Sequence, residues 1–262
     1  MNITHSIILG IVEGITEFLP ISSTFHLIWT STLLNLKQTE FIKLFEVFIQ
    51  GGAILAVVFL YWQEVLRNFS LFKKLIVSFI PTAVVGLVLY KIIKGIFFES
   101  TITMTVIFIL VGVLFLIVEY LIKKGKIVTK REIESMTYRE AITVGLYQSL
   151  AVMPGVSRAG SVMFGMMSMG FRREEAAKYS FMLAIPTILA ASALDLIKMR
   201  DVVIANSSRL DVLIIGFVVA FISALFVVKW LIGYLQTNTL KTFGWYRIVA
   251  GIILLLILWS SR

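Results

Sequence analysis

The sequence predicts an all-α polytopic membrane protein with about six transmembrane helices and two re-entrant helix–loop–helix hairpins, arranged as an inverted-topology internal repeat. Three observations support this fold. Hydrophobic residues make up 59% of the 262 residues and charged residues only 15%, whereas a soluble domain is roughly 45–50% apolar. Long apolar runs recur at the length of a bilayer span. Two further apolar stretches are interrupted in their middle by proline, glycine and serine.

The apolar runs that read as full spans are each close to the ~20 residues that cross a bilayer as a helix. They are bounded by polar and charged segments, and together they predict a single membrane domain over residues 1–262. The runs lie near 40–62, 74–94, 103–122, 178–197, 210–232 and 243–261.

Two stretches do not fit a simple span. Residues 3–34 are broken at Pro20, and residues 138–169 are broken at Pro154. Each stretch can form two half-helices, and non-helical backbone is tolerated at membrane depth only where protein or a water-filled cavity surrounds it. We therefore predict two re-entrant hairpins, with a proline-kinked full span as the alternative for either one.

The hairpins are related in sequence. Pro20 and Ser23 match Pro154 and Ser157 at an offset of 134. Each hairpin is followed by three spans, an odd number, so the second half must be inverted relative to the first. Inverted repeats with interrupted helices place their sites near the bilayer midplane, at the repeat interface. The two halves are about 1–125 and 135–262.

The distribution of Lys and Arg predicts the orientation. If the N-terminus lies on one side, then 63–73, 123–139, 170–178 and the ends near 229–247 lie on the other, and these carry more Lys and Arg. Basic loops favour the cytoplasmic side. Both termini should therefore face outward. The net charge of +9 then reflects these loops and indicates no nucleic-acid partner.

Other composition features exclude several classes of chemistry. The chain has no cysteine, so disulfides, thiolate metal sites and a cysteine nucleophile are excluded. No Lys or Arg precedes the first apolar stretch, and that stretch soon reaches Glu13. It is therefore not expected to be a cleavable signal peptide.

The first hairpin carries two carboxylates. Glu13 and Glu17 are four residues apart and share one face of a helix. Such a pair can coordinate a hard divalent cation, or one member can act as a general base. A pair satisfied by neighbouring helices is the structural alternative, but a charge at bilayer depth costs roughly 2.5–3.5 kcal/mol.

Beyond the proline, Ser22 and Ser23 lie within one helical turn of His26. Either hydroxyl could hydrogen-bond the imidazole, an arrangement suited to nucleophile activation or proton transfer. The alternative is that these serines cap the second half-helix.

The second hairpin supplies Arg158. A guanidinium in apolar surroundings favours an oxyanion, and its planar fork fits phosphate. Gly155 and Gly160 allow close backbone approach to a ligand, and a half-helix beginning near Ser157 points its N-terminus at the same place. Gln148, the counterpart of Glu13, adds an uncharged polar contact. A structural ion pair between Arg158 and a glutamate of the first hairpin is the alternative, and a ligand would open it.

These residues predict a membrane-embedded site for an anionic group. That description fits a hydrolase of a lipid phosphate and equally a transporter of an anion. A purely structural scaffold leaves the buried charges unexplained.

The motifs resemble those of the undecaprenyl-diphosphate phosphatase family of bacterial inner-membrane proteins, which is associated with bacitracin resistance. The resemblance covers nearly the whole chain. The segments that carry it are Glu13-Gly-x-x-Glu17-Phe-Leu-Pro20-x-Ser22-Ser23-Thr24-x-His26, Phe45-Glu46-Val47-x-x-Gln50, Met136-Thr137-Tyr138-Arg139 and Pro154-Gly155-x-Ser157-Arg158-x-Gly160.

The resemblance implies removal of the terminal phosphate from a polyprenyl diphosphate. The products would be inorganic phosphate and the monophosphate lipid carrier that is recycled in cell-wall synthesis. It also implies a divalent cation (Mg²⁺ or Ca²⁺) and an active site that opens to the periplasmic or outer face. A homodimer is an assembly that it allows.

By position, the resemblance makes Glu13 and Glu17 the metal or acid–base carboxylates, Ser23 and His26 the nucleophile or proton-transfer candidates, and Arg158 the diphosphate ligand. The attacking group is either Ser23, assisted by His26, or a water activated by Glu17 or His26. The rival function is a flippase for the monophosphate lipid, which needs an anion site but no nucleophile. The further substrate-binding candidates are Ser22, Gln148, Gly155, Ser157, Gly160 and Ser161.

The chain departs from the family pattern at three positions. Phe25 stands where a glycine is usual, Ala159 where a second serine is usual, and Val162 where a threonine is usual. The last two changes remove hydroxyls near the expected phosphate, with Ser161 close enough to supply one. They bear on the phosphate contacts, and through them on substrate range or rate.

Overall fold

The computed structural model describes residues 1–97, 101–206 and 209–260, and its regular elements are helices. Within these ranges, six helices are long and apolar enough to cross a membrane. This confirms the prediction of a polytopic membrane protein with about six spans. The six are α3 (Glu40–Arg67), α4 (Phe69–Phe97), α5 (Thr101–Lys123), α8 (Arg173–Lys198), α10 (Leu210–Thr237) and α11 (Lys241–Ser260).

The two interrupted stretches form pairs of separate short helices. The first pair is α1 (Ile3–Thr16) and α2 (Ser23–Leu33), and the second is α6 (Tyr138–Ser149) and α7 (Arg158–Ser168). In each pair the second helix packs back against the first, so neither stretch is one continuous kinked helix. We call the connection 17–23 the first tip and the connection 153–158 the second tip. Three short elements complete the order: the 3₁₀ turns η1 (Ile133–Ser135) and η2 (Leu150–Val152), and α9 (Arg200–Ala205).

In each tip, the residue before the following helix is a serine with a left-handed backbone. Ser22 has φ 68° and Ser157 has φ 73°, and each immediately precedes a helix of 11 residues. The structural correspondence therefore pairs Ser22 with Ser157 and Ser23 with Arg158, one residue away from the sequence match of Ser23 with Ser157. The turn is marked by its backbone conformation, because a left-handed φ is uncommon outside glycine. The residue type does not mark it.

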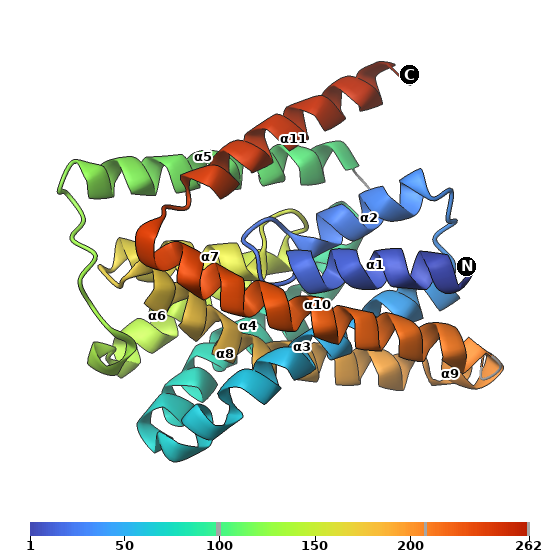
Figure 1. Ribbon diagram of the computed structural model, residues 1–262, viewed down its shortest axis with the longest axis horizontal. Helices are drawn as coiled ribbons and strands as arrows, with labels where there is room; N and C mark the ends of the chain where they lie inside the picture. The colour runs from blue at the N-terminus through green and yellow to red at the C-terminus, as the bar shows by residue number, and fades with distance from the viewer. Residues whose placement is uncertain (98–100, 207–208, 261–262) are drawn as a thin grey trace.

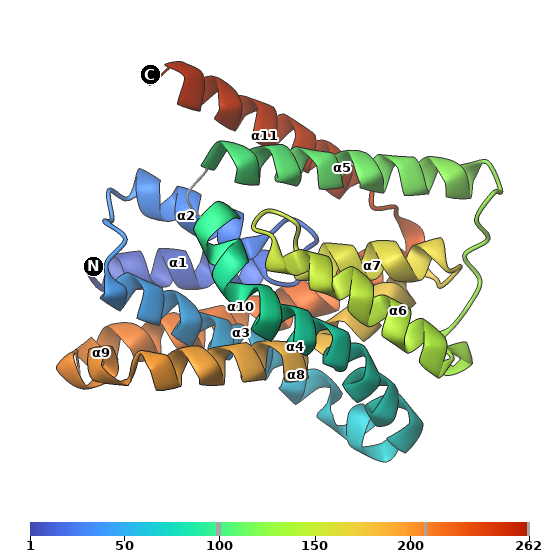
Figure 2. The ribbon, with the colours of Figure 1, turned by 180° about the vertical axis from the view of Figure 1, so that it is seen from behind.

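The helices pack in a consistent pattern around the tips. In both views, α1 lies along α10, α6 lies along α4, and α5 lies along α11 (Figures 1 and 2). The largest buried core joins residues of the first tip and of α7. Phe18 and Ile21 of the first tip share it with Ala159, Val162 and Met163. The broken helices thus meet inside the protein.

A buried ion pair fixes one end of the bundle. Glu119 of α5 is 1% exposed and accepts a hydrogen bond from Arg173 Nε of α8 at 2.8 Å. Its Oε1 also accepts from the backbone N–H of Leu240 at 2.9 Å. This carboxylate therefore connects α5, α8 and the turn before α11.

Candidate functional site

The two tips bring three of the predicted residues into direct contact. Ser23 Oγ donates to Glu17 Oε2 at 2.6 Å, and Arg158 Nη2 lies 3.2 Å from Glu17 Oε1. The Arg158 and Glu17 side chains are only 10% and 5% exposed. One carboxylate thus joins a hydroxyl from its own hairpin to a guanidinium from the other. The ion pair across the hairpins that we gave as the structural alternative for Arg158 is present.

Helix N-termini meet at the same place. Ser23 is the first residue of α2 and Arg158 is the first residue of α7. Free backbone N–H groups at a helix N-terminus favour anions. Ser157 caps α7, because its Oγ accepts from Gly160 N at 3.2 Å, whereas Ser22 makes no such capping bond.

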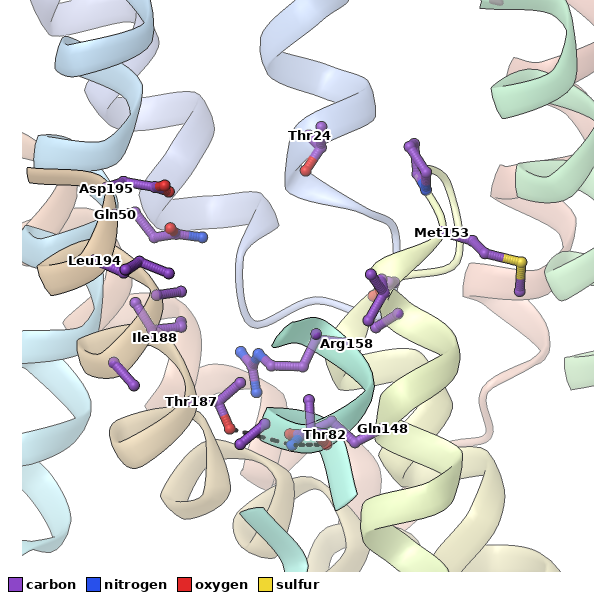
Figure 3. Close-up of a pocket in the computed structure, with 18 of the residues that line it drawn as sticks. Thr24, Gln50, Thr82, Gln148, Met153, Arg158, Thr187, Ile188, Leu194 and Asp195 are labelled. Atoms are coloured by element: carbon purple, nitrogen blue, oxygen red, sulfur yellow. Dashed lines mark hydrogen bonds between the residues drawn. The ribbon is translucent and has the colours of Figure 1, made fainter. Parts of the chain in front are cut away.

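These groups face a cavity of about 820 Å³, and Figure 3 shows part of its lining. The cavity lies between the two tips and helices α4 and α8. Its polar members include six of the predicted side chains. They are Glu17, Ser22, Ser23, Gln148, Ser157 and Arg158, and the backbone of Gly155 also contributes.

One end of the cavity carries an amide between two threonines. Gln148 Nε2 donates to Thr82 Oγ1 at 2.9 Å and to Thr187 Oγ1 at 3.1 Å, as Figure 3 shows beneath Arg158. We call Thr82, Gln148 and Thr187 the amide end. The sequence predicts the glutamine but not the threonines, since lone threonines in apolar runs follow no pattern.

Glu13 lies behind the cavity lining. It is 1% exposed and interacts electrostatically with Glu17, Glu46 and Arg158. Its Oε2 has no hydrogen-bond partner among the described residues. A buried carboxylate oxygen without a donor is suited to a cation.

Glu13 and Glu17 are the carboxylates that we predicted to bind a divalent cation. In the described part of the chain, no group of three or more His, Cys, Asp or Glu could hold a metal ion. Mg²⁺, however, is commonly bound through one or two carboxylates, with waters and substrate phosphates completing its shell. Glu13 and Glu17 fit that mode of binding.

His26 is turned away from Glu17 and from the Ser23 hydroxyl. Its Nδ1 lies 2.8 Å from the backbone O of Ser22, and its Nε2 lies 2.6 Å from the Tyr246 hydroxyl. His26 is not part of the described cavity lining. The predicted bond between the imidazole and a serine hydroxyl is therefore not formed here, because the ring faces α11 and the Ser23 hydroxyl faces Glu17.

Gly155 of the second tip and Gly160 of α7 allow close helix packing. Gly155 has φ 93°, and a Cβ on it would lie 2.5 Å from the backbone O of Met104. A Cβ on Gly160 would lie 2.9 Å from the ring of Phe115. Gly160 is outside the described lining, so its close approach is to α5, whereas we expected it to face a ligand.

The three departures from the family pattern are buried in packing contacts. Phe25 stacks on Phe108 with ring centroids 3.9 Å apart, and Ala159 and Val162 lie in the main core. Ser161 donates to the backbone O of Arg158 at 3.0 Å and does not face the described cavity. In this arrangement Ser161 holds the first turn of α7.

Two residues that contact this region, Tyr246 and Arg247, were not predicted. Both lie in the range 229–247 that the Lys and Arg distribution assigns to a helix end near the cytoplasm. Arg247 instead lies inside α11 and is fully buried. A charge within an apolar run was the signal that could have identified it.

Comparison with known proteins shows which family the chain resembles over nearly its whole length. Residues 6–253 match the family described as Bacitracin resistance protein BacA. The undecaprenyl-diphosphatase of Aquifex aeolicus is 45% identical over 249 residues, which cover 95% of this chain and 96% of that protein. Those of Sulfurihydrogenibium sp. and Persephonella marina are 47% and 45% identical, over 97% and 98% of this chain and 98% and 99% of theirs.

Proposed function

Since this chain belongs to the bacitracin resistance protein BacA family and is an undecaprenyl-diphosphatase of a bacterial membrane, we propose that Glu17, Ser23 and Arg158 are the groups that perform the hydrolysis. The observation that carries this proposal is the contact of Ser23 Oγ with Glu17 Oε2 at 2.6 Å, on the wall of the cavity. The substrate is undecaprenyl diphosphate, and its diphosphate would lie at the two tips.

Arg158 is poised to receive the diphosphate. Its Nη1 donates to the backbone O of Ser180 at 2.9 Å, which fixes the side chain, while its Nε has no partner among the described residues. A phosphate oxygen would take the Nε donor and compete with Glu17 for Nη2. Substrate binding would then release the carboxylate from the ion pair, and the N-termini of α2 and α7 would add N–H donors.

Glu17 would act as the base toward Ser23. The Ser23 hydroxyl proton passes to Glu17 as Ser23 Oγ bonds to the terminal phosphorus, and the bond from that phosphorus to the bridging oxygen breaks. Undecaprenyl phosphate leaves and takes the proton from Glu17, which is a carboxylate again. Water then attacks the phosphoserine, and Glu17 takes a proton from this water and returns it to Ser23 Oγ as inorganic phosphate is released. His26 is not required as a base in this route, because both of its ring nitrogens are already engaged.

Glu13 and Glu17 would hold the divalent cation, Mg²⁺ or Ca²⁺, together with the substrate phosphates. When bound there, the cation neutralises phosphate charge and acts as a Lewis acid. The partnerless Oε2 of Glu13 supports this assignment. The remaining acid–base work falls to the side chains described above.

The cavity wall supports lateral admission of the prenyl chain. Leu87 and Val88 of α4 line the cavity and are 72% and 69% exposed. Ile188, Ala191 and Leu194 of α8 also belong to the wall. A cavity whose apolar wall reaches the lipid-facing surface lets a lipid diphosphate enter with its chain still in the bilayer.

We further propose that the two helix pairs are re-entrant hairpins of an inverted repeat, with both termini and the site on the outer face. The packing of α1 on α10 and of α6 on α4 supports the repeat, since the same relation recurs in each half. Cysteine labelling of intact cells at Met1 and Arg131 tests the orientation. The homodimer stays a prediction, for which the test is light scattering of the purified protein.

The proposal is tested by phosphate release from undecaprenyl diphosphate by the purified protein, with and without EDTA. Metal-dependent release that is lost in Glu17→Gln and Ser23→Ala, with a phosphoserine trapped during turnover, supports the covalent route. Full activity of Ser23→Ala with ¹⁸O-water incorporation into phosphate would instead assign the attack to water.

A further inference from the structure

A single buried arginine contacts both tips. Arg247 of α11 is 0% exposed. Its Nη1 donates to the backbone O of Pro20 at 3.0 Å, and its Nη2 donates to the backbone O of Gly155. These carbonyls belong to hairpins that lie 135 residues apart in the chain. One guanidinium therefore bridges the two non-helical connections that form the site.

The rest of the guanidinium is anchored in the same way. Its Nε donates to the backbone O of Phe108 at 2.9 Å, and the Nη2 group also lies 3.4 Å from the backbone O of Val156. The guanidinium lies over the Phe108 ring, 4.3 Å from its centroid. Among the described residues no carboxylate pairs with it. Its partners are backbone carbonyls and aromatic faces.

This bonding pattern differs from that of a loop arginine that only sets the orientation in the membrane. It also differs from that of an ordinary ion pair. A buried charge is normally paired with an opposite charge. Here the donors satisfy carbonyls that the two tips cannot satisfy themselves, since both connections are non-helical. The planar fork of arginine holds its donors in fixed directions on three separate nitrogens, whereas lysine presents its three donors from one compact nitrogen.

The bridged carbonyls stand in equivalent places. Pro20 is three residues before Ser23, and Gly155 is three residues before Arg158. Arg247 therefore sets the separation between the residue that we assign as nucleophile and the residue that we assign as phosphate ligand. It does not line the described cavity, so it acts through the tips and not on the substrate.

We infer that Arg247 is a positioning residue that fixes the two tips relative to each other for the reaction. This inference rests on the proposed roles of Ser23 and Arg158. A displacement of about 1 Å in a positioned group can lower a rate by about 100-fold. Loss of the bridge should therefore lower kcat by about tenfold or more, while KM stays within about threefold of the wild-type value.

The test uses Arg247→Lys and Arg247→Met, with Arg173→Lys as the matched control. Arg173 is also partly buried and joins helices through Glu119, but it does not contact the tips. The chain has no cysteine, so spin labels at Thr24→Cys and Met153→Cys report the distance between the hairpins. Figure 3 labels both of these positions at the cavity.

The expected result is a lower kcat with a broadened interspin distance in the Arg247 variants, and neither change in Arg173→Lys at a comparable thermal stability. An unchanged kcat, or an unchanged distance distribution, in folded Arg247→Lys would overturn the inference. The proposed function fails separately, through retained activity of Glu17→Gln and Ser23→Ala in the wild-type Arg247 background.

Discussion

Ser23 and Arg158 occupy the same place in their two hairpins and contact the same carboxylate. Each is the first residue of a short helix that follows a left-handed serine. Ser23 donates to Oε2 of Glu17 and Arg158 to Oε1. Two corresponding positions thus carry a nucleophile candidate and a cation, and the glutamate between them couples the two.

The first prediction concerns Ser23. Ser23→Ala should lower kcat by about 10²–10⁴-fold, because it removes the hydroxyl that Glu17 can deprotonate. Ser31→Ala is the matched control on the same helix, since Ser31 is buried and its hydroxyl has no partner in the described part of the chain. Phosphate release measures both. Equal losses in the two variants would indicate damage to α2 and not to the reaction.

A second prediction separates binding from chemistry at Arg158. Arg158→Lys should raise KM by roughly 10- to 100-fold, the worth of hydrogen bonds to a charged group, because lysine cannot replace both the fork and the free Nε. Initial rates over a range of undecaprenyl diphosphate concentrations measure it. An unchanged KM would mean that the diphosphate is held elsewhere.

Tyr246 provides a third prediction. Tyr246→Phe removes the hydroxyl that bonds His26 Nε2. It should leave kcat within about threefold of the wild-type value, because His26 is not the base in the proposed route and one neutral hydrogen bond has a small net worth. Tyr234→Phe is the control, because that hydroxyl bonds Thr242 at 2.7 Å and belongs to no part of the described cavity lining. A loss of kcat of about tenfold or more in Tyr246→Phe alone would give the His26 ring a role in the reaction and contradict the proposed route.

A fourth prediction tests the backbone of the second tip. Gly155→Ala should lower the free energy of unfolding by more than about 1 kcal/mol, since its φ is positive and its new Cβ meets the backbone of Met104. Gly125→Ala shares the positive φ, at 70°, but its Cβ meets nothing within 4 Å. Thermal unfolding in detergent should therefore show the smaller loss for Gly125→Ala. The reverse order would contradict the close contact with α5.

The fifth prediction concerns pH and a pair at the start of α6. Arg131 Nη2 donates to Glu140 Oε2 at 3.0 Å, and this bond lowers the pKa of the Glu140 carboxyl to about 2. A lowered folded pKa stabilises the protein above the ordinary carboxyl range, and that stability is lost as the pH falls towards about 2. Glu140→Gln should therefore lower the melting temperature at about pH 7, and the difference should shrink towards about pH 3. A constant difference would show that the carboxylate charge does not contribute.

Local sequence signals were enough to find the spans and the breaks, and to name a pairing of Arg158 with a glutamate as one of two alternatives. Apolar runs report length, and proline and glycine report interruption. The partners of His26 could not be found in this way. A spacing of three or four residues places Ser22 and Ser23 near the imidazole. The hydrogen-bond partner of His26 Nε2 is nevertheless Tyr246, which is 220 residues away in the sequence.

The role of Arg247 could not be predicted from the sequence for a different reason. A basic residue near the end of an apolar run fits the positive-inside rule as well as it fits a buried site. Only the three-dimensional arrangement reveals that the carbonyls of both tips converge on it. The sequence match of Ser23 with Ser157 differs by one residue from the match of the two tips in backbone conformation for a similar reason, because the feature that the tips share is a backbone angle.

The hydrogen-bond directions at the amide end have a consequence for the lipid headgroup. The hydroxyls of Thr82 and Thr187 donate to the backbone O of Gly145 and of Leu183, respectively. The Gln148 amide donates to the two threonine hydroxyls. None of these hydroxyl or amide protons is left for a ligand, so the amide end offers no hydrogen-bond donor to an anion. An anion that has reached Arg158 thus meets an electron-rich wall beyond it. This polarity opposes passage of a phosphate through the protein and favours turnover on one side, so reconstituted vesicles should hydrolyse the diphosphate without translocating the monophosphate.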